Sequence, residues 1–418
     1  MSFVDTLVYQ AHFGTPIQQT QAAVELRTMA REKGIVPSSL YKLYRARGKE
    51  QIPSNFTVPA MNLRGLSYLT AQAAFTAAQK SDTGLFIFEL ARSEMRYTAQ
   101  NPEQLVSSVL AAALNTNWNK PVFIQADHVQ PKAASPGIMK EGEKAAISDL
   151  IRECLDAGIY NIDLDGSTLV NPDEPTEYDQ QRSNFTYTAE FVRLITEWQP
   201  AGVTPAIGFE VSEVGTHLSK SSQIAAFMTG FSDVYSTIGK MSEFFGFTKV
   251  AIETGTKHGG TVNRDGTPGP MLVDFERLQT LSLLARHKYG MAGAVQHGAS
   301  TLSKDIFTKF PEYEAAEIHL STGFQNLIMD HPYFPQDLIA KMYKWCDLHC
   351  STDKRPDQSA AQFYVKTRKK AWGAYKEESW KLPPENLQHI KDSLENECLL
   401  YFESLNVTNT QNLLLEFV

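Results

Sequence analysis

Short apolar runs recur along the chain, and longer amphipathic segments separate them. Eight such runs are present, and polar residues or glycine stand at their downstream ends. Near-continuous apolar runs are typical of buried parallel strands, and apolar residues at three- and four-residue steps are typical of helices. The runs are Phe56–Asn62, Gly84–Arg92, Pro121–His128, Tyr160–Ser167, Ala206–Gly215, Lys249–Gly260, Gly293–Ser300 and Ala316–Gly323.

Eight strand–helix units are the number that closes a parallel (β/α)8 barrel, or TIM barrel. We therefore predict an α/β protein of this fold. Polar stretches at residues 170–184 and 219–223 follow the fourth and fifth runs, and we expect them to be mobile loops at the active site. The helices expected between strands cover residues 65–80, 102–115, 143–158, 188–199 and 274–288.

Further helical patterns precede the first run and follow the last one. A TIM barrel typically needs about 250 residues, whereas this chain has 418. The excess predicts extra N-terminal and C-terminal helices. The additional patterns lie at residues 19–34, 38–50, 337–350, 360–380 and 384–405. We expect an N-terminal helical extension (1–50), a catalytic barrel (51–330) and a C-terminal helical extension packed on the barrel (331–418).

Composition narrows the class of protein. A hydrophobic content of 42% with 21% charged residues is typical of a globular enzyme. The net charge of −8 argues against nucleic-acid binding, which needs a basic face. No apolar run reaches the roughly 18 residues of a membrane span, and the N-terminus lacks the features of a signal peptide. These features predict a cytoplasmic protein with no membrane partner.

The four cysteines do not form the pattern of a disulfide framework. Cys346 and Cys350, with His349 between them, have a spacing that suits either a metal site or two small residues on the buried face of a helix. We favour the buried face because no second Cys/His pair lies nearby in sequence. Cys154 and Cys398 are expected at core positions of helices.

Three histidines stand at the downstream ends of predicted strands, where TIM-barrel active sites lie. His128, His258 and His297 end the third, sixth and seventh runs. Three neutral imidazoles are a suitable ligand set for a catalytic Zn²⁺ with an open position. A single histidine at a strand end is more often a hydrogen-bonded rim residue, but three at one rim favour a metal site.

Two carboxylates join this rim from the fourth and fifth runs. Asp165 and Glu213 follow the apolar parts of these runs. They are expected either to contact a metal or its histidine ligands, or to be rim residues satisfied by backbone amides. The residues alone leave both alternatives open.

Seven segments resemble motifs of the class II, metal-dependent ketose-bisphosphate aldolases, and they occur in that family's order over about residues 50 to 330. FTVPAMN resembles AxPAFN, PVFIQADH resembles PVxLHLDH, and CLDAGIYNIDLDGS resembles AGFxSVMIDGS. FEVSEVG resembles EAELG, GTKHGG resembles GxxHG, VQHGAS resembles LHGGS, and EIHLSTGFQ resembles KxNIDTDxQ. The resemblance covers the whole predicted barrel.

This resemblance implies a lyase that cleaves and forms the C3–C4 bond of a phosphorylated ketose, such as fructose or tagatose bisphosphate, through a metal-stabilised enediolate. It implies one catalytic Zn²⁺, and it gives Asp165 and Glu213 a second cation position or the task of orienting the histidines. Asp127 is implied to be the acid and base on the substrate C4 hydroxyl. A helix-capping role for Asp127 is the alternative.

The chain departs from the family in the loop after the fifth run. The family carries there a glutamate that exchanges the second proton, whereas this chain reads THLSKSSQ. His217 is our candidate for the missing group.

Phosphate recognition is implied at small residues near the strand ends. Backbone amides and hydroxyls at such turns can hold a phosphate, although the glycines alone are equally consistent with plain turns. His319 and Ser321 replace the family's Asn and Asp, and His319 is a candidate for binding phosphate or carboxylate. The expected substrate-binding residues are Asn62, Gly259, Gly298, Ser300, His319, Ser321 and Thr322.

Two functions remain in view. The first is the aldolase; the second is a metal-dependent epimerase that acts on a sugar or sugar acid at the same site. Arg92 and Arg96 follow the second run and either bind the far end of the substrate or form surface salt bridges. A small-molecule sugar phosphate is the expected partner, and we expect a homo-oligomer.

Overall fold

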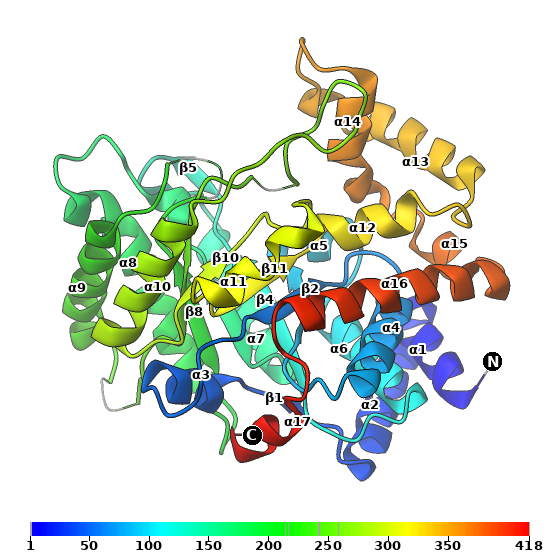
Figure 1. Ribbon diagram of the computed structural model, residues 1–418, viewed down its shortest axis with the longest axis horizontal. Coiled ribbons are helices and arrows are strands. Elements are labelled where there is room, and N and C mark those ends of the chain that lie inside the picture. Colours follow the sequence, from blue (N-terminus) through cyan, green and yellow to red (C-terminus); the bar gives the residue numbers. More distant parts are fainter. Residues whose placement is uncertain (1, 214, 216, 241–242, 258, 418) are drawn as a thin grey trace.

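Eight parallel strands close into a barrel in the computed structural model, which describes residues 2–213, 215, 217–240, 243–257 and 259–417 (Figure 1). The strands pair in the order β4-β3-β2-β11-β10-β9-β8-β7, and β7 pairs again with β4. The predicted TIM barrel is thus confirmed. Its strands are β2 (Val58–Asn62), β3 (Ile87–Ala91), β4 (Val122–Val129), β7 (Asn161–Leu164), β8 (Ala206–Glu210), β9 (Lys249–Ile252), β10 (Ala294–Gln296) and β11 (Glu317–Leu320).

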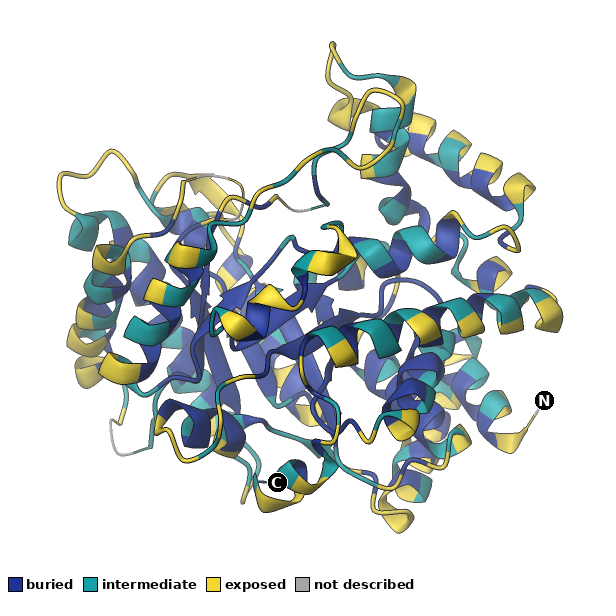
Figure 2. Ribbon diagram, viewed as in Figure 1, coloured by how far each residue is buried: buried dark blue, intermediate teal, exposed yellow. Residues whose placement is uncertain are grey.

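Helices surround the barrel and bury their apolar faces against it (Figure 2). Each predicted inter-strand helix is present, because the apolar residues at three- and four-residue steps form one buried stripe. The helices that follow the strands are α4 (Ser67–Lys80), α6 (Pro102–Asn115), α7 (Glu143–Ala157), α8 (Glu177–Trp198), α9 (Ser221–Ile238), α10 (Phe275–Tyr289), α11 (Lys309–Glu312) and α12 (Thr322–Met329).

Two segments expected as mobile loops are partly helical. Helix α8 begins at Glu177, inside the predicted loop 170–184, because the Thr176 hydroxyl caps it by accepting a hydrogen bond from the Asp179 N–H at 3.1 Å. Helix α9 begins inside the predicted loop 219–223 and was missed altogether. Its buried residues Ile224, Phe227, Phe231 and Tyr235 show the helical spacing that would have revealed it.

The N-terminal segment has two parts: residues 3–32 pack against α6 on the outside of the barrel, and residues 37–48 lie at the end of the barrel opposite the strands' carboxyl ends. In α3, Arg47 donates to the carbonyl oxygens of Phe56 (2.6 Å) and Ala315 (3.0 Å), which immediately precede β2 and β11. Strand β1 pairs with the outer part of β4 and is not a barrel strand. The elements here are α1 (Phe3–Phe13), α2 (Pro16–Glu32), β1 (Pro37–Ser38) and α3 (Tyr41–Gly48).

In the C-terminal segment, residues 336–380 lie beyond α12, whereas the following helix (384–404) packs on α4 and the last one (411–417) lies against α3 (Figure 1). The helix predicted over 360–380 is broken into three, because the Gly373 N–H donates to Tyr97 O at 2.9 Å instead of continuing the helical ladder. The elements are α13 (Gln336–His349), η3 (Ser351–Asp353), α14 (Ala360–Thr367), η4 (Arg368–Ala371), α15 (Lys376–Trp380), α16 (Pro384–Ser404) and α17 (Gln411–Phe417).

Smaller elements complete the chain around the barrel. They are α5 (Arg92–Tyr97), the β5–β6 hairpin (Ala133–Ser135 and Ile138–Met139), η1 (Ser167–Leu169) and η2 (Lys304–Ile306). All four cysteines are free and buried, as expected for core positions. In the described part of the chain, no helix combines the length and apolarity that crossing a bilayer requires.

Candidate metal and active site

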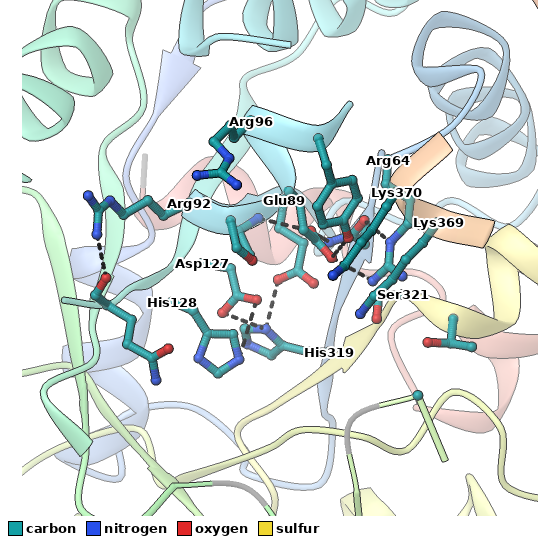
Figure 3. A pocket seen from close by; sticks show the side chains of 18 of the residues that line it. Arg64, Glu89, Arg92, Arg96, Asp127, His128, His319, Ser321, Lys369 and Lys370 are labelled. Carbon is teal, nitrogen blue, oxygen red and sulfur yellow. Dashed lines mark hydrogen bonds and ion pairs between the residues drawn. The ribbon is translucent and has the colours of Figure 1, made fainter. Parts of the chain in front are cut away.

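A cavity of about 990 Å³ lies at the carboxyl ends of the strands (Figure 3). Its floor is built from the last residues of the strands and the residues just after them, where parallel strands of a barrel converge. The C-terminal segment supplies part of the facing wall. The ionisable floor residues are Glu89, Asp127, His128, Asp165, Glu210, His297 and His319.

Asp127 and His128 both line the cavity although they are neighbours in β4. Successive residues of a regular strand point to opposite faces. Here the register between β4 and β7 shifts between Ala126 and Val129, and His128 has a left-handed backbone with φ of +42°. The irregular end of the strand therefore presents an acid and an imidazole to the same space.

His128, Glu210 and His297 form a compact group with the composition of a metal site. Their potential ligand atoms all lie within 4.8 Å of one another. The Glu210 Oε1 atom is 2.9 Å from His128 Nδ1 and 3.4 Å from His297 Nε2. His258, the third predicted imidazole, lies outside the described residues. The structure thus brings His128 and His297 together, and their role as metal ligands stays a prediction.

Glu210, rather than Glu213, is the carboxylate of this strand that contacts the imidazole of His128. Glu213 is three residues further on, is exposed, and still lines the cavity. Burial, together with the nearby charges of Asp165 and Glu210, raises the pKa of Glu213. Sequence reasoning missed Glu210, although this polar residue ends an apolar strand and therefore meets the same criterion as the histidines.

Asp165 is fixed by hydrogen bonds on both carboxylate oxygens. Its Oδ2 atom is 2.9 Å from His128 Nδ1 and accepts from Gln130 Nε2 at 2.6 Å. Its Oδ1 atom accepts from the backbone N–H and the hydroxyl of Ser167 at 3.0 and 2.6 Å. The two alternatives stated for Asp165 are thus both visible: it orients a histidine and it is satisfied by a backbone amide.

The donor set fits a divalent cation. Asp165 and Glu210 both lie 2.9 Å from His128 Nδ1, a nitrogen that carries at most one hydrogen and cannot fully satisfy both carboxylates. Asp127 adds a third carboxylate, with Oδ2 at 3.7 Å from His128 Nε2. A divalent ion bound by imidazole and carboxylate ligands would neutralise this excess of negative charge.

The same charges shift the pKa values of the ionisable residues on the cavity floor. Burial lowers the pKa of His128, but the carboxylates of Asp127 and Glu210 outweigh it and hold the pKa well above its usual value. Burial raises the pKa of Asp127, but the positive charges of His128 and His319 dominate and hold it well below its usual value. For His297, burial and its two charged histidine neighbours both lower the pKa.

His319 is enclosed by carboxylates. Its Nδ1 atom is 2.7 Å from Glu89 Oε2 and 3.3 Å from Asp127 Oδ1, and its Nε2 atom is 2.8 Å from Glu317 Oε1. Burial lowers the pKa of His319, but Glu89 and Asp127 raise it well above its usual value. Burial raises the pKa of Glu89 to about 8. These contacts favour a place beside Asp127 over the predicted role in binding a substrate anion.

A second charged layer lies deeper in the barrel, below His319. Lys249 Nζ is 3.0 Å from Asp163 Oδ2, donates to Gln125 Oε1 at 2.6 Å and forms an ion pair with Glu317. The Tyr44 hydroxyl of α3 donates to the other oxygen of Glu317. The floor of the cavity therefore rests on a buried network that reaches the N-terminal end of the barrel, and sequence reasoning did not find it.

Four of the predicted phosphate-binding residues line one part of the cavity. They are Gly259, Gly298, Ser321 and Thr322. Gly259 and Gly298 have φ angles of +76° and +69°, so a side chain there would be strained. This conformation fits both alternatives, a plain turn and a close approach of backbone to a ligand, so the phosphate role stays a prediction.

Three other predicted residues lie differently. Asn62 lines the cavity, where it donates to Glu94 at 2.5 Å and accepts from Arg64 Nε at 3.2 Å. Ser300 is buried beneath the rim, and its hydroxyl accepts from the Gly323 N–H at 3.1 Å. His217 is exposed and is absent from the described cavity lining. The catalytic role of His217 remains untested.

The two arginines after β3 differ from each other. Arg92 forms a 2.5 Å ion pair with Glu143 and donates to Gln130 O at 2.7 Å, as the salt-bridge alternative expected. Arg96 also lines the cavity, and its side chain has no ion pair with any described residue. In Figure 3 it lies on the far side of Asp127 from His319.

The family model for fructose-bisphosphate aldolase class-II matches residues 49–348, which is most of the chain. The protein belongs to the class II fructose-bisphosphate aldolase family. This family is typically metal-dependent and acts on sugar phosphates, and the clusters of histidine and carboxylate residues at the cavity floor are consistent with metal binding. No curated protein matches this chain in sequence.

Solved structures agree with the family fold. A putative fructose-1,6-biphosphate aldolase from Coccidioides immitis is 15% identical, with a TM-score of 0.53 and coverage of 88% of this chain and 97% of that one. A probable tagatose 6 phosphate kinase from Sinorhizobium meliloti is 14% identical, with a TM-score of 0.57 and coverage of 86% and 93%. The fructuronate-tagaturonate epimerase UxaE from Cohnella laeviribosi is 11% identical, with a TM-score of 0.58 and coverage of 89% and 83%. At these identities the likeness establishes the fold alone.

Proposed function

We propose that this class II aldolase-family protein is a metal-dependent aldolase that cleaves and forms the C3–C4 bond of a ketose. The observation that carries the proposal is the end of β4, where Asp127 and His128 both face the cavity beside His297 and Glu210. This arrangement places a carboxylate base next to the candidate metal ligands. An aldol cleavage needs both, because one group must remove a hydroxyl proton while another polarises the carbonyl.

Asp127 is the proposed acid and base. In cleavage its carboxylate takes the proton of the C4 hydroxyl, C4 becomes an aldehyde carbon, and the electrons of the C3–C4 bond remain with the C3 fragment. His128 and His319 lower the pKa of Asp127 well below its usual value, so the carboxylate is ionised and ready to accept that proton. In the synthetic direction the same group returns the proton to the new C4 oxygen.

His128, Glu210 and His297 are the described residues that would hold the metal, with His258 as the proposed further ligand and Asp165 as the group that orients His128. We propose Zn²⁺ because imidazole and carboxylate ligands suit it. When bound, the ion would act as a Lewis acid on the C2 carbonyl.

The second proton, which C3 receives after cleavage, requires a separate group. Glu213 is our candidate because it lines the cavity and its pKa is raised, and a carboxyl with a raised pKa exchanges protons more readily near neutral pH. His217, the candidate proposed from the sequence, remains the alternative.

For the substrate we propose a phosphorylated ketose such as fructose or tagatose bisphosphate. The support is the family's substrate class and the small residues Gly259, Gly298, Ser321 and Thr322 along one part of the cavity. A cytoplasmic location and a homo-oligomeric state complete the proposal. We also propose that residues 51–330 form one catalytic barrel and that 1–50 and 331–418 are its N-terminal and C-terminal extensions.

An epimerase is the second candidate function. Glu213 is the single carboxylate among the described residues 211–213, 215 and 217–220 of the loop after β8, and it precedes the stretch in which the family carries its loop acid. If C3 is protonated slowly, the two fragments can rejoin before they leave. Rejoining on the other face of the aldehyde would give a C4 epimer and no free triose.

Product analysis on the zinc-loaded protein tests the two functions. Fructose and tagatose 1,6-bisphosphate, the corresponding 1-phosphates and the two ketohexuronates would each be incubated with the protein. The aldolase proposal expects triose phosphate from the phosphorylated ketoses. Interconversion of C4 epimers with no triose would replace it with the epimerase, and no change in any substrate would reject both.

A further inference from the structure

The wall of the cavity facing the strand ends includes residues that lie beyond the part of the chain matched by the family model. That match ends at residue 348, whereas His349, Lys369 and Lys370 all line the cavity. These residues come from the end of α13 and from η4. This chain therefore completes its own cavity with a segment whose role the family match does not describe.

Helix η4 is held firmly against α12, the helix that begins at Thr322. The buried guanidinium of Arg368 donates to Asn326 Oδ1 at 2.8 Å and to Asp330 Oδ2 at 2.7 Å. Arg64, on the cavity wall, donates to Gln325 Oε1 of the same helix at 3.3 Å. The position of η4 next to α12 brings Lys369 toward the part of the cavity lined by Ser321 and Thr322, and Figure 3 shows Lys369 on the Ser321 side.

Lys369 differs from the other cations around it. Arg64 forms an ion pair with Glu94 at 2.6 Å, and Lys370 forms one with Asp353 at 2.6 Å. Lys369 has neither an ion pair nor a side-chain hydrogen bond with any residue that the structure describes. Burial and the charge of Arg64 lower the pKa of Lys369 to about 8. The nearby carboxylates of Glu94 and Asp353 are already paired with Arg64 and Lys370, and a half-buried ammonium with no ion pair of its own is costly unless an anion joins it.

We propose that Lys369 is the charged member of an anion subsite for the ketose, with Ser321 and Thr322 as its hydroxyl partners. The ligand chemistry is a phosphate or a carboxylate at the end of the substrate that lies farther from Asp127. The inference rests on the proposed function for its substrate class. Lys369 would supply the positive charge for an anion that His319, which is enclosed by carboxylates, and the neutral Ser321 do not supply.

Binding of small anions tests the subsite without any turnover. Inorganic phosphate and acetate would be titrated by calorimetry into the wild type, Lys369→Met, Lys369→Arg and Lys366→Met, the last being an exposed lysine of the same segment. Lys369→Met should weaken phosphate binding about 10- to 100-fold, the usual effect of one charge-assisted hydrogen bond. Lys366→Met should bind as the wild type does, and the stronger of the two anions identifies the natural group.

The pH dependence gives a second readout. The charged groups facing Lys369 are Arg64 from the loop after β2, Glu94 from α5, Lys370 from η4 and Asp353 from η3. The lowered pKa means that the free side chain loses its proton as the pH rises through about 8. Acetate is fully ionised throughout, so its affinity should fall above that pH in the wild type. Lys369→Arg, which does not titrate there, should retain binding.

The outcomes separate this inference from the proposed function. Phosphate and acetate affinities that are equal in the wild type and Lys369→Met overturn the subsite, even where ketoses are cleaved normally. Lys369-dependent anion binding in a protein that cleaves no ketose leaves the subsite standing and rejects the aldolase. Where both hold, Lys369→Met should raise KM for the anionic ketose, with little change in kcat and no effect on a neutral ketose.

Discussion

The backbone at His128 shows how one residue shapes the site. A φ of +42° is uncommon for a residue with a side chain and costs about 1–2 kcal/mol relative to the right-handed region. Strained residues persist where the surroundings hold them, and they gather at functional sites. At this position the strain has a visible effect, since it turns the His128 imidazole toward Glu210 while Asp127 keeps its place beside His319.

Replacement of Asp127 by Asn tests its proposed role in proton transfer. The amide keeps the shape of the side chain but cannot accept the hydroxyl proton, so turnover should fall by about 10²- to 10⁴-fold. Zinc content, measured by mass spectrometry of the purified protein, should stay at the wild-type level because Asp127 is not among the proposed ligands. Undiminished turnover would overturn this role. The helix-capping alternative is already wrong, because the next helix, α7, begins at Glu143 with Gly142 as its N-cap.

Glu210 and Glu213 provide a matched pair for the metal site. Glu210→Gln should weaken zinc binding by about 10- to 100-fold, because its carboxylate lies against His128 Nδ1 and near His297. Glu213→Gln should leave zinc affinity close to that of the wild type and lower kcat instead. Competition with a chelator measures the first effect, and steady-state kinetics measures the second. If Glu213→Gln weakened zinc binding and Glu210→Gln did not, Glu213 would be the metal ligand.

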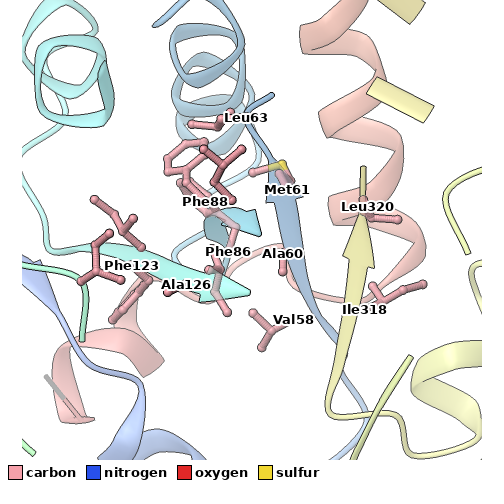
Figure 4. Close-up of a cluster of buried hydrophobic side chains, with 14 of the residues drawn as sticks. Val58, Ala60, Met61, Leu63, Phe86, Phe88, Phe123, Ala126, Ile318 and Leu320 are labelled. Atoms are coloured by element: carbon pink, nitrogen blue, oxygen red, sulfur yellow. The ribbon is translucent and has the colours of Figure 1, made fainter. Parts of the chain in front are cut away.

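At the scale of elements, the strands carry two different faces. Apolar side chains such as Phe88, Phe123, Ile318 and Leu320 form the buried cluster between the strands and the helices (Figure 4). The alternate residues of the same strands point into the barrel and include charged groups. β11 shows this directly, since Glu317 and His319 alternate with the two apolar residues.

Lys249 is the central cation of this interior layer. Lys249→Met would leave the carboxylates of Asp163 and Glu317 without their ion pair, which costs about 3–5 kcal/mol when one partner of a buried pair is removed. Thermal unfolding should therefore begin at a markedly lower temperature. Lys144→Met, which removes an exposed cation from a 2.8 Å pair with Glu190, should cost at most about 1 kcal/mol.

The pH dependence of the stability of Lys249→Met is a separate check. In the wild type Lys249 lowers the pKa of Glu317, so this contribution to stability is present at neutral pH and is lost as the pH falls. Burial raises the pKa of Asp163 to about 6 in the wild type although Lys249 lowers it, so removal of the lysine should raise this pKa further above that of the unfolded chain. The variant should then lose stability as the pH rises through this raised value, so its deficit relative to the wild type should shrink in acid.

The sequence predicted the barrel and much of its rim because strand ends can be located from apolar runs alone. His128 and His297 were found in this way and Asp127 through the resemblance to the aldolase family, and the structure places all three on the cavity floor. The interior layer was not found, although its polar residues are visible inside the runs. Pairing Lys249 with Glu317 requires the order and register of strands that are distant in the chain, and no local pattern contains that information.

At the scale of the whole molecule, the C-terminal segment could be predicted as helical but not placed. Its amphipathic patterns say that each helix has an apolar face, but not which surface that face covers. The position of η4 depends on Arg368 reaching Asn326 and Asp330 of α12, a contact between side chains roughly 40 residues apart. The wall of the cavity, including Lys369, therefore appeared only in the structure.

The long loop between β9 and α10 connects the barrel to this segment (Figure 1). Gln362 of α14 donates to Val262 O at 2.8 Å, and the Ser359 hydroxyl donates to Arg264 O at 2.6 Å. Gln362→Ala should loosen the loop that contributes Gly259 to the cavity and should raise KM several-fold. Gln362 also caps α14 by accepting from the Ser359 N–H at 3.1 Å, and Gln18 caps α2 in the same way by accepting from the Thr15 N–H at 2.9 Å. Gln18→Ala, which removes a cap far from this loop, should therefore leave KM unchanged.

These hydrogen bonds between the loop and α14 would couple the docking of α14 energetically to the binding of a ligand in the cavity. If a bound ketose favours the loop position in which Val262 and Arg264 meet α14, then docking of α14 must favour the ketose by the same factor, because such coupling is reciprocal. Amides of α14, which touch no substrate, should then exchange with deuterated water more slowly when the cavity is filled. Helix α14, which lies in the C-terminal segment, would thus report events at the end of β4.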